Sequence, residues 1–375
     1  MISRTCLPPV VKARTIHLLS NAGMFASLAF IPNIANDLGA SSTQIGFIVA
    51  LYSFTFLLSS WVFGRAADIF GRRRIIQFGL LAASVAILLQ MFAWSPFTLG
   101  LSRALAGFAL GSFPAAVIAY AYEEGDRMGR FSSFAALGWG VGVLSAGIFT
   151  AASGKFLASS ILVFVAFLVS LAITRDVTIP HKVPVFPVSV IRKNLRIYSA
   201  ILIRHTGASM IWMFFPLYME SLGASHLLVG IVYAVNASGQ FVIMPIADRY
   251  RAHPLILAGL ISSFLTFLTF AIAQNPYQLI PTQLALAMSW SLTYVGCLKY
   301  ITKNNVERAT ASGMLGAAVS AAAIVGPLLA GISVHFVGYR WTIVIAAFVA
   351  SIALLQYLAT GWLAKRDKTP GPLGS

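Results

Sequence analysis

Two stretches of this chain carry the same residues, one near the N-terminus and one just beyond the middle. They align at a constant offset of 184 positions over residues 23–46 and 207–230. The identities are Gly23 with Gly207, Phe30 with Phe214, Pro32 with Pro216, Leu38–Ser41 with Leu222–Ser225, and Gly46 with Gly230. Because the offset is about half of the 375 residues, the repeat predicts a tandem duplication: two similar halves with a pathway between them.

The chain is also too apolar for a soluble protein. Hydrophobic residues make up 58% of it and charged residues 10%, and the mean hydropathy is +0.84. Long apolar segments recur along the whole length, which predicts an all-α polytopic membrane protein. Twelve transmembrane helices are expected, six in each half, at residues 13–37, 43–67, 74–94, 97–121, 130–152, 156–174, 196–221, 226–247, 254–273, 277–300, 308–334 and 339–364.

Positive charge sets the expected orientation of these helices. The formal net charge of +16 would suit a nucleic-acid partner, but the Lys and Arg residues follow the positive-inside pattern instead. With the N-terminus inside, only Lys155 and Arg340 fall in outer loops, and only Arg103 and Arg204 fall well within spans. We therefore expect a multi-pass protein of the cell membrane with both termini cytoplasmic and no nucleic-acid partner.

Proline marks a linker between the two halves. Pro180, Pro184 and Pro187 oppose a continuous helix in this region. The expected organisation is an N-terminal six-helix bundle at residues 1–174, a cytoplasmic linker at 175–195, and a C-terminal six-helix bundle with a short tail at 196–375. A linker of this length is too short to be a catalytic domain.

Sequence signatures of enzymes are missing. The six histidines are scattered without the spacing of a metal site, and the chain has neither a P-loop lysine motif nor a dinucleotide fingerprint. We therefore expect no metal, no cofactor and no enzymatic activity, and energy for any transport would come from gradients. Nothing in the fold requires a partner chain, so a monomer surrounded by membrane lipids is expected.

A charged motif follows the second expected helix. Residues 64–74 read GRAADIFGRRR. This segment resembles the signature of the major facilitator superfamily, G-x-x-x-D-x-x-G-R-[RK]-[RK], with Gly64, Asp68, Gly71, Arg72 and Arg73 at the matching places. The second half has a weaker copy, PIADRYRAHP from Pro245, that keeps an Asp–Arg pair but lacks the glycines. The resemblance implies two six-helix bundles that rock around a central site.

The resemblance also implies two latches at the inner ends of the helices. A carboxylate there can cap the positive N-terminus of a neighbouring helix and pair with an arginine. Asp68 would cap the helix at 308–334 while pairing with Arg127 or Arg130, and Asp248 would pair with Arg308 beside the helix at 130–152. A plainer interpretation is that these charges only mark the cytoplasmic side. The expected gating residues are Gly64, Asp68, Gly71, Arg72, Arg127, Arg130, Asp248 and Arg308.

Two further patterns bear on the kind of transporter. Arg103, Gly107 and Gly111 resemble the arginine motif that the family carries in its fourth helix. The helix at 130–152 lacks the Gly-Pro pair that resembles a marker of drug/proton antiporters, and a Gly-Pro pair occurs instead at Gly326–Pro327. This departure weakens an antiporter interpretation without removing it.

Polar and aromatic residues on the expected cavity helices are the candidate binding groups. They recur at helical spacing, which places them on common faces, although such stripes also serve helix packing. The resemblance implies that the first, fourth, seventh and tenth helices line the cavity. The expected substrate-binding residues are Asn21, Arg103, Arg204, His205, Trp212, Tyr233, Asn236, Gln240, Gln283, Trp290 and Tyr294.

No acidic residue falls in the middle of an expected span. All ten lie at helix ends or in loops, so no buried carboxylate is available to hold a cationic drug or a proton. Two membrane arginines without acidic partners, Arg103 and Arg204, instead favour an anionic group on the substrate. The competing interpretation is that both arginines bind backbone carbonyls structurally. His205 is the candidate proton carrier, or only a hydrogen-bonding group.

Three functional hypotheses follow. The leading one is a secondary transporter that moves a small organic solute by alternating access, with an organic anion as the favoured substrate. It would be coupled to protons through His205, or be an uncoupled facilitator. The second is a multidrug/proton antiporter that exports lipophilic compounds. The third is a non-transporting membrane sensor or scaffold, which would need a sizeable output domain that the sequence does not show.

Overall fold

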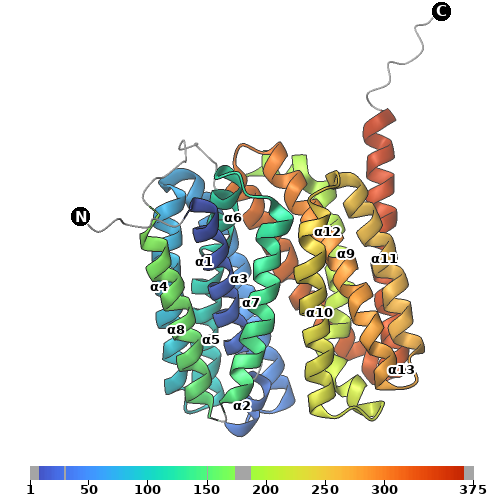
Figure 1. Cartoon of the computed structure of the whole chain (residues 1–375). Coiled ribbons are helices and arrows are strands. Elements are labelled where there is room, and N and C mark those ends of the chain that lie inside the picture. The colour runs from blue at the N-terminus through green and yellow to red at the C-terminus, as the bar shows by residue number, and fades with distance from the viewer. Residues whose placement is uncertain (1–7, 29–30, 150, 174–186, 367–375) are drawn as a thin grey trace, which may run out of the picture.

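The computed structural model describes residues 8–28, 31–149, 151–173 and 187–366, and within these ranges it contains helices and no strands (Figure 1). The first half holds eight α-helices and a 3₁₀ turn, and the second half holds five and another 3₁₀ turn. They are α1 (Pro9–Leu28), α2 (Ile31–Asp37), α3 (Ser42–Phe70), α4 (Arg72–Leu89), η1 (Gln90–Phe92), α5 (Pro96–Gly111), α6 (Pro114–Glu123), α7 (Met128–Ile148), α8 (Ala152–Leu171), α9 (Val188–Ser221), α10 (His226–Ala247), α11 (Ala252–Ile272), η2 (Pro276–Gln278), α12 (Leu279–Asn304) and α13 (Arg308–Arg366).

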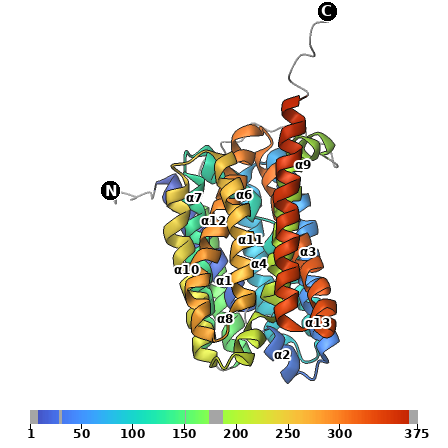
Figure 2. The same cartoon turned by 90° about the vertical axis from the view of Figure 1, so that its right-hand side faces the viewer.

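These elements form the twelve crossings that the hydropathy predicts. The first crossing comprises α1 and α2, with residues 29–30 between them outside the described ranges, and the fourth is divided into α5 and α6. The last two crossings are both in α13, which is interrupted at Gly338 with φ 72° and ψ 178°. Gly338 permits this left-handed conformation because it has no Cβ, and the chain turns back there (Figure 2). The prediction of an all-helical, twelve-crossing fold is confirmed.

The repeated Leu-Gly-Ala-Ser segment builds the same turn in both halves. Gly39 and Gly223 adopt φ angles of 82° and 89°, which end the preceding helices. Two residues later, Ser41 and Ser225 cap the next helices by accepting hydrogen bonds from backbone N–H groups, each at 3.3 Å. The repeat therefore preserves a helix stop followed by a helix start, at matching places in the two bundles.

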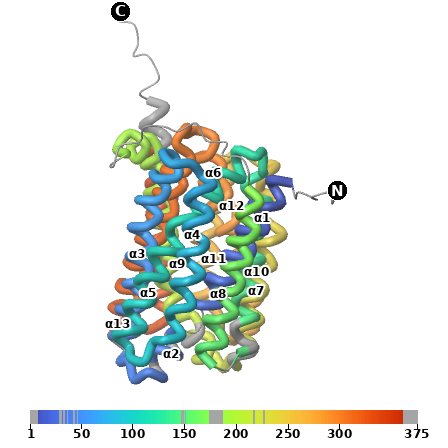
Figure 3. Tube along the Cα trace, turned by 90° about the vertical axis from the view of Figure 1, so that its left-hand side faces the viewer, coloured from blue at the N-terminus to red at the C-terminus, as the bar shows by residue number. Residues whose placement is uncertain are grey.

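The outer surface is typical of a protein solvated by lipid. Phe78, Phe97 and Phe336 expose 72%, 74% and 77% of their surface. Exposed aromatic and aliphatic side chains at this density would aggregate in water. Eight helices within the described ranges are long and apolar enough to cross a membrane. In the N-terminal half, α3, α4, α5 and α8 lie side by side and present much of this surface (Figure 3).

The halves meet mainly along two helix pairs, α3 with α13 and α7 with α10. Glycines allow the backbones to approach closely. A Cβ added to Gly64 would lie 2.8 Å from the carbonyl oxygen of Ala309, and one added to Gly313 would lie 2.4 Å from that of Ser60. The described ends of the chain, at Pro9 and Arg366, lie at one end of the molecule (Figure 1). We call this the inner end, because it is the end that the charge pattern predicts to be cytoplasmic.

The predicted linker at 175–195 lies partly outside the described residues. From Val188 the chain is already helical, so α9 begins before the predicted start at residue 196 and runs for 34 residues to Ser221. No proline follows Pro187 until Pro216, which allows this longer helix.

A glycine substitution can test the packing inside the N-terminal half. A Cβ on Gly142 would lie 2.3 Å from the carbonyl oxygen of Ala22, so Gly142→Ala must push α7 away from α1. We expect a loss of about 1–3 kcal/mol in stability, measured as a lower thermal unfolding midpoint in detergent. Gly331→Ala is the matched control, because its Cβ would meet nothing within 4 Å. Equal midpoints for the two variants would contradict this packing.

Candidate functional site

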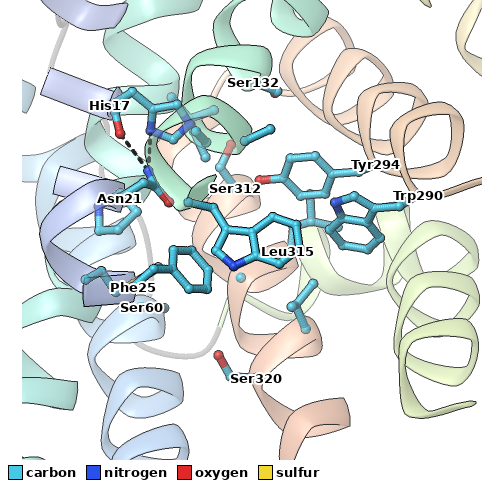
Figure 4. Close-up of a pocket in the computed structure, with 18 of the residues that line it drawn as sticks. His17, Asn21, Phe25, Ser60, Ser132, Trp290, Tyr294, Ser312, Leu315 and Ser320 are labelled. Carbon is cyan, nitrogen blue, oxygen red and sulfur yellow. Dashed lines mark hydrogen bonds between the residues drawn. The ribbon is translucent and has the colours of Figure 1, made fainter. Parts of the chain in front are cut away.

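A cavity of about 460 Å³ lies between the two halves, and residues of α1, α3, α5, α6 and α7 line it from one side and residues of α9, α10, α12 and α13 from the other. Figure 4 shows side chains from both halves pointing into it. The volume suits a small organic molecule. The polar or aromatic side chains that line it are His17, Ser20, Asn21, Phe25, Phe56, Ser60, Phe113, Ser132, Trp139, Arg204, His205, Trp212, Asn236, Gln240, Trp290, Tyr294, Ser312 and Ser320.

Aromatic rings form much of the wall and join the halves. Trp139 of α7 meets Trp212 of α9 edge to face, with ring centroids 6.3 Å apart, and meets Tyr233 of α10 at 6.2 Å. Trp212 and Tyr233 stack at 5.1 Å. On α12, Trp290 and Tyr294 stack at 4.9 Å. These rings present flat apolar surfaces to whatever occupies the cavity.

Arg204 is the one Lys or Arg among the described residues that line the cavity, and no Asp or Glu lines it there. Its Nε donates to the Ser263 hydroxyl at 2.9 Å, and its Nη2 donates to the Ser289 hydroxyl at 3.0 Å. The guanidinium also lies 5.3 Å from the ring centroid of Trp290. Its Nη1 has no hydrogen-bond acceptor in the described structure. All these contacts are to neutral groups, so the charge of Arg204 is uncompensated.

His205 follows Arg204 and lines the same wall. Its ring centroid lies 5.0 Å from that of Trp290. Its Nδ1 is buried and has no hydrogen-bond partner in the described part of the chain. His205 therefore lines the cavity with its ring, while its unpaired Nδ1 is enclosed by protein.

Arg103 does not belong to the cavity, so its prediction as a binding residue was wrong. It is fully buried inside the N-terminal half, 4.0 Å from the ring centroid of Tyr52, and donates to Gln90 Oε1 at 3.3 Å. The prediction failed because depth along a helix does not determine which face is turned inward. Arg103 lies on the face of α5 that packs within its own bundle.

A chain of amides lies on the C-terminal side. Gln240 donates from Nε2 to Asn236 Oδ1 at 2.6 Å, and Asn236 donates from Nδ2 to Gln283 Oε1 at 2.7 Å. Asn236 and Gln240 line the cavity, as predicted, whereas Gln283 is fully buried behind them. Tyr233 likewise supports the wall through Trp212 and does not line it. Gln283 and Tyr233 are therefore supporting residues.

The N-terminal side holds groups that the sequence analysis missed. Asn21, which it predicted, donates from Nδ2 to the backbone oxygen of His17 at 2.7 Å and faces its ring Nδ1 at 3.3 Å (Figure 4). His17 lines the cavity and stacks on Phe131 at 4.1 Å. Ser132 and Trp139 of α7 also line it. They are seven residues apart, a helical spacing that could have revealed them.

Asp68 caps a helix of the other half, at the inner end of the interface. Its carboxylate accepts hydrogen bonds from the backbone N–H of Thr310 at 2.7 Å and of Ala309 at 3.4 Å, at the start of α13. Its arginine partner is Arg72, at 2.5 Å, so the predicted pairing with Arg127 or Arg130 was wrong. The reason is local: Gly71, with φ 98°, turns the chain so that Arg72 folds back over Asp68.

Asp248 makes the matching contact on the other helix pair. It accepts from the backbone N–H groups of Gly129 at 2.7 Å and Arg130 at 2.8 Å, at the start of α7. Its predicted partner Arg308 instead lies 3.5 Å from Glu123 of α6. Arg308 begins α13, the helix that Asp68 caps, and therefore lies beside α3 and α6 rather than beside α10. Arg127 is exposed, and its backbone N–H donates to Asp126 Oδ1.

No three His, Cys, Asp or Glu side chains gather into a possible metal site within the described ranges. The groups that the cavity offers to a bound molecule are hydrogen-bonding side chains, aromatic rings and the uncompensated guanidinium of Arg204.

Comparison with known proteins agrees with this architecture. The chain is 38% identical to the puromycin resistance protein pur8 of Streptomyces alboniger over 32% of its own length, but this match spans only 25% of that protein. It is 24% identical to the class B tetracycline resistance protein of Escherichia coli, covering 91% of this chain and 94% of that protein. The crystal structure of the human organic anion transporter MFSD10 (TETRAN) superposes with a TM-score of 0.79 at 13% identity, covering 95% of this chain and all of the other, which shows a common fold.

The sequence profile of one protein family matches each half of the chain separately. It matches residues 15–199 and again residues 197–375. Together with the twelve crossings and the central cavity, this match shows that the chain belongs to the Major Facilitator Superfamily.

Proposed function

We propose that this protein is a secondary transporter that carries a small amphipathic organic anion across the membrane by alternating access. The observation that carries the proposal is the content of the cavity. Its walls are aromatic and apolar, and Arg204 is the one Lys or Arg that lines it, with no Asp or Glu, among the described residues.

The surroundings of Arg204 support an anionic ligand. A cation held away from water is costly unless an opposite charge compensates it. Two serine hydroxyls hold the Nε and Nη2 groups, which orients the guanidinium but leaves its charge unbalanced. A carboxylate or similar group that enters the cavity can accept from the remaining Nη1 and supply the missing charge. The stacked rings of Trp290 and Tyr294 beside it would hold an aromatic body.

The contacts at the inner end support alternating access. The halves are held together there by carboxylates of one half on helix N-termini of the other, Asp68 on α13 and Asp248 on α7. Such polar contacts can break and re-form as the halves rock, because water satisfies both partners when they separate. We assign the gating role to these two caps, with Arg72, Glu123 and Arg308 as their supporting ion pairs.

Proton-coupled drug export is the second candidate. Drug export is favoured by the names of two similar proteins, the puromycin and the tetracycline resistance proteins. The cavity fits a lipophilic drug as well, but the lining provides no carboxylate to attract a cationic one. The two candidates share the cavity and differ in the charge of the ligand. The family match favours both over a sensor or scaffold.

The proposal includes the location of the protein in the cell membrane and the orientation of its termini. The distribution of Lys and Arg supports a multi-pass protein of the cell membrane with both termini in the cytoplasm. The two bundles, at residues 1–174 and 196–375, would form the transport unit as a monomer that needs only its substrate, lipids and, if coupled, protons.

The ligand charge can be tested by thermal stabilisation of the purified protein. 2-Naphthoate should raise the unfolding midpoint, because a ligand at a hundredfold excess over its Kd stabilises by about 2.7 kcal/mol, whereas tetraphenylphosphonium should not. Arg204→Gln should weaken naphthoate binding at least tenfold, and Arg204→Lys should retain part of it. Arg103→Gln is the matched control, since Arg103 is equally buried but outside the cavity. Stabilisation by the phosphonium alone, unchanged in Arg204→Gln, would move drug export to first place.

The inner latch can be tested by cysteine accessibility. A Ser320→Cys reporter in the cavity, with Cys6 and Cys297 replaced, is labelled by a membrane-impermeant thiol reagent from the inner side. Asp68→Asn should speed this labelling by about five- to thirtyfold, because losing a charged cap costs about 1–2 kcal/mol. Glu124→Gln is the control, since this carboxylate lies at the end of α6 on the same side and accepts no hydrogen bond from a helix start of the other half within the described ranges. Equal labelling of both variants would count against the latch.

Proton coupling can be tested in liposomes with an imposed pH gradient. If His205 carries the proton, His205→Asn should lose gradient-driven accumulation of naphthoate but keep exchange without a gradient. His17→Gln is the comparison: the Nδ1 of His17 faces the Asn21 amide, whereas that of His205 is free. Whatever it does to affinity, His17→Gln should keep the gradient dependence. Gradient-driven accumulation that persists in His205→Asn would exclude this histidine as the carrier.

A further inference from the structure

We propose that the cavity contains two fixed hydrogen-bond acceptors, Asn21 Oδ1 and Gln240 Oε1, and that they restrict the substrate to organic anions that also carry hydroxyl or N–H groups. This inference rests on the proposed function and narrows its substrate class. It adds a second recognition element to the charge at Arg204, with one acceptor on each half of the protein.

The Asn21 amide is oriented by contacts within its own helix. Its Nδ2 donates to the backbone oxygen of His17 at 2.7 Å and lies 3.3 Å from the His17 Nδ1, so the amide nitrogen is directed along α1. Asn21 Oδ1 has no donor among the described residues, and it is not one of the buried unpaired atoms. Because Asn21 lines the cavity, this oxygen is the part of the amide that a ligand can reach (Figure 4).

The Gln240 amide is oriented in the same sense by the other half. Its Nε2 donates to Asn236 Oδ1, and Asn236 in turn donates to Gln283 Oε1. Turning Gln240 over by itself would place two carbonyl oxygens together and break the chain, whose far end is Gln283, with its Nε2 buried and without a partner among the described residues. Gln240 lines the cavity, and its Oε1 is neither bonded within the described structure nor among the buried unpaired atoms. The amide chain thus presents Gln240 Oε1 to a ligand as an acceptor, beside the one Nε2 hydrogen that Asn236 does not accept.

Fixed acceptors discriminate more sharply than hydroxyls. A serine hydroxyl in the cavity can rotate and either donate or accept, so it tolerates both kinds of ligand group. An amide nitrogen that the protein already holds leaves the amide oxygen to accept from a ligand: Asn21 keeps its Nδ2 on the His17 backbone oxygen, and Gln240 keeps one of its two Nε2 hydrogens on Asn236. A ligand that covers Asn21 or Gln240 without offering a donor leaves a buried oxygen unpaired, which costs about 1–3 kcal/mol. The cavity should therefore reject the methylated counterpart of a donor-bearing ligand.

The test uses two matched pairs of probes that differ only in the donor. 6-Hydroxy-2-naphthoate is compared with 6-methoxy-2-naphthoate, and 6-amino-2-naphthoate with 6-dimethylamino-2-naphthoate, by calorimetric titration of the purified protein. We expect the donor-bearing member of at least one pair to bind about tenfold more tightly. This preference should fall in Asn21→Leu or in Gln240→Met, and it should disappear in the double variant.

Asn194→Leu is the matched control. Asn194 is a buried amide that also donates to the backbone oxygen four residues earlier, at 2.8 Å from Val190, but it lies outside the cavity. This variant should keep the preference. Equal binding within both pairs, with binding still lost in Arg204→Gln, would overturn the two-acceptor inference and leave the anion proposal standing. Failure of all four naphthoates to bind, or binding that Arg204→Gln leaves unchanged, would overturn the anion proposal and this inference with it.

Discussion

The contact between the Asp68 carboxylate and the first N–H groups of α13 determines how the two halves meet. A helix N-terminus buried in an interface leaves backbone donors without partners, and a carboxylate satisfies them while balancing the helix dipole. Asp248 repeats this arrangement on α7. Because each carboxylate belongs to the opposite half from the helix it caps, closing the inner end and satisfying the helix ends are a single event. The central cavity lies between the two helix pairs along which the halves mainly meet, α3 with α13 and α7 with α10.

The placement of acidic residues connects this interface to the cavity. The carboxylates that cap helix N-termini, such as Asp68 and Asp248, lie at the inner end, and none of the described residues that line the cavity is acidic. Arg204 is therefore left with neutral partners. The rest of the lining consists of amides, hydroxyls and aromatic rings, which provide shape and hydrogen bonds but no negative charge to oppose that of Arg204.

Much of the fold was predictable from the sequence, and less of the site. The repeat and the apolar segments led to twelve crossings, and Asp68 and Asp248 were expected at helix starts of the other half, where the structure places them. Their arginine partners were predicted wrongly, because an ion pair depends on which side of a helix end each side chain leaves. Arg103 was assigned to the cavity from its depth alone, whereas its direction turns it into its own bundle.

The sequence by itself determined the architecture. Hydrocarbon requires every crossing to be a helix with its backbone satisfied internally, so apolar length alone sets the number of crossings, and Gly39 and Gly223 mark the repeated turn. Only the tertiary structure decided which side chains share the cavity. Helix rotation and the approach of α7 to α10 brought Trp139 to Trp212 and Tyr233, and hydrogen bonds to His17 and Asn236 oriented the amides of Asn21 and Gln240. The aromatic contacts join residues far apart in the chain, and the hydrogen bonds select one of the two orientations of each amide. Neither effect leaves a periodic signal in the sequence.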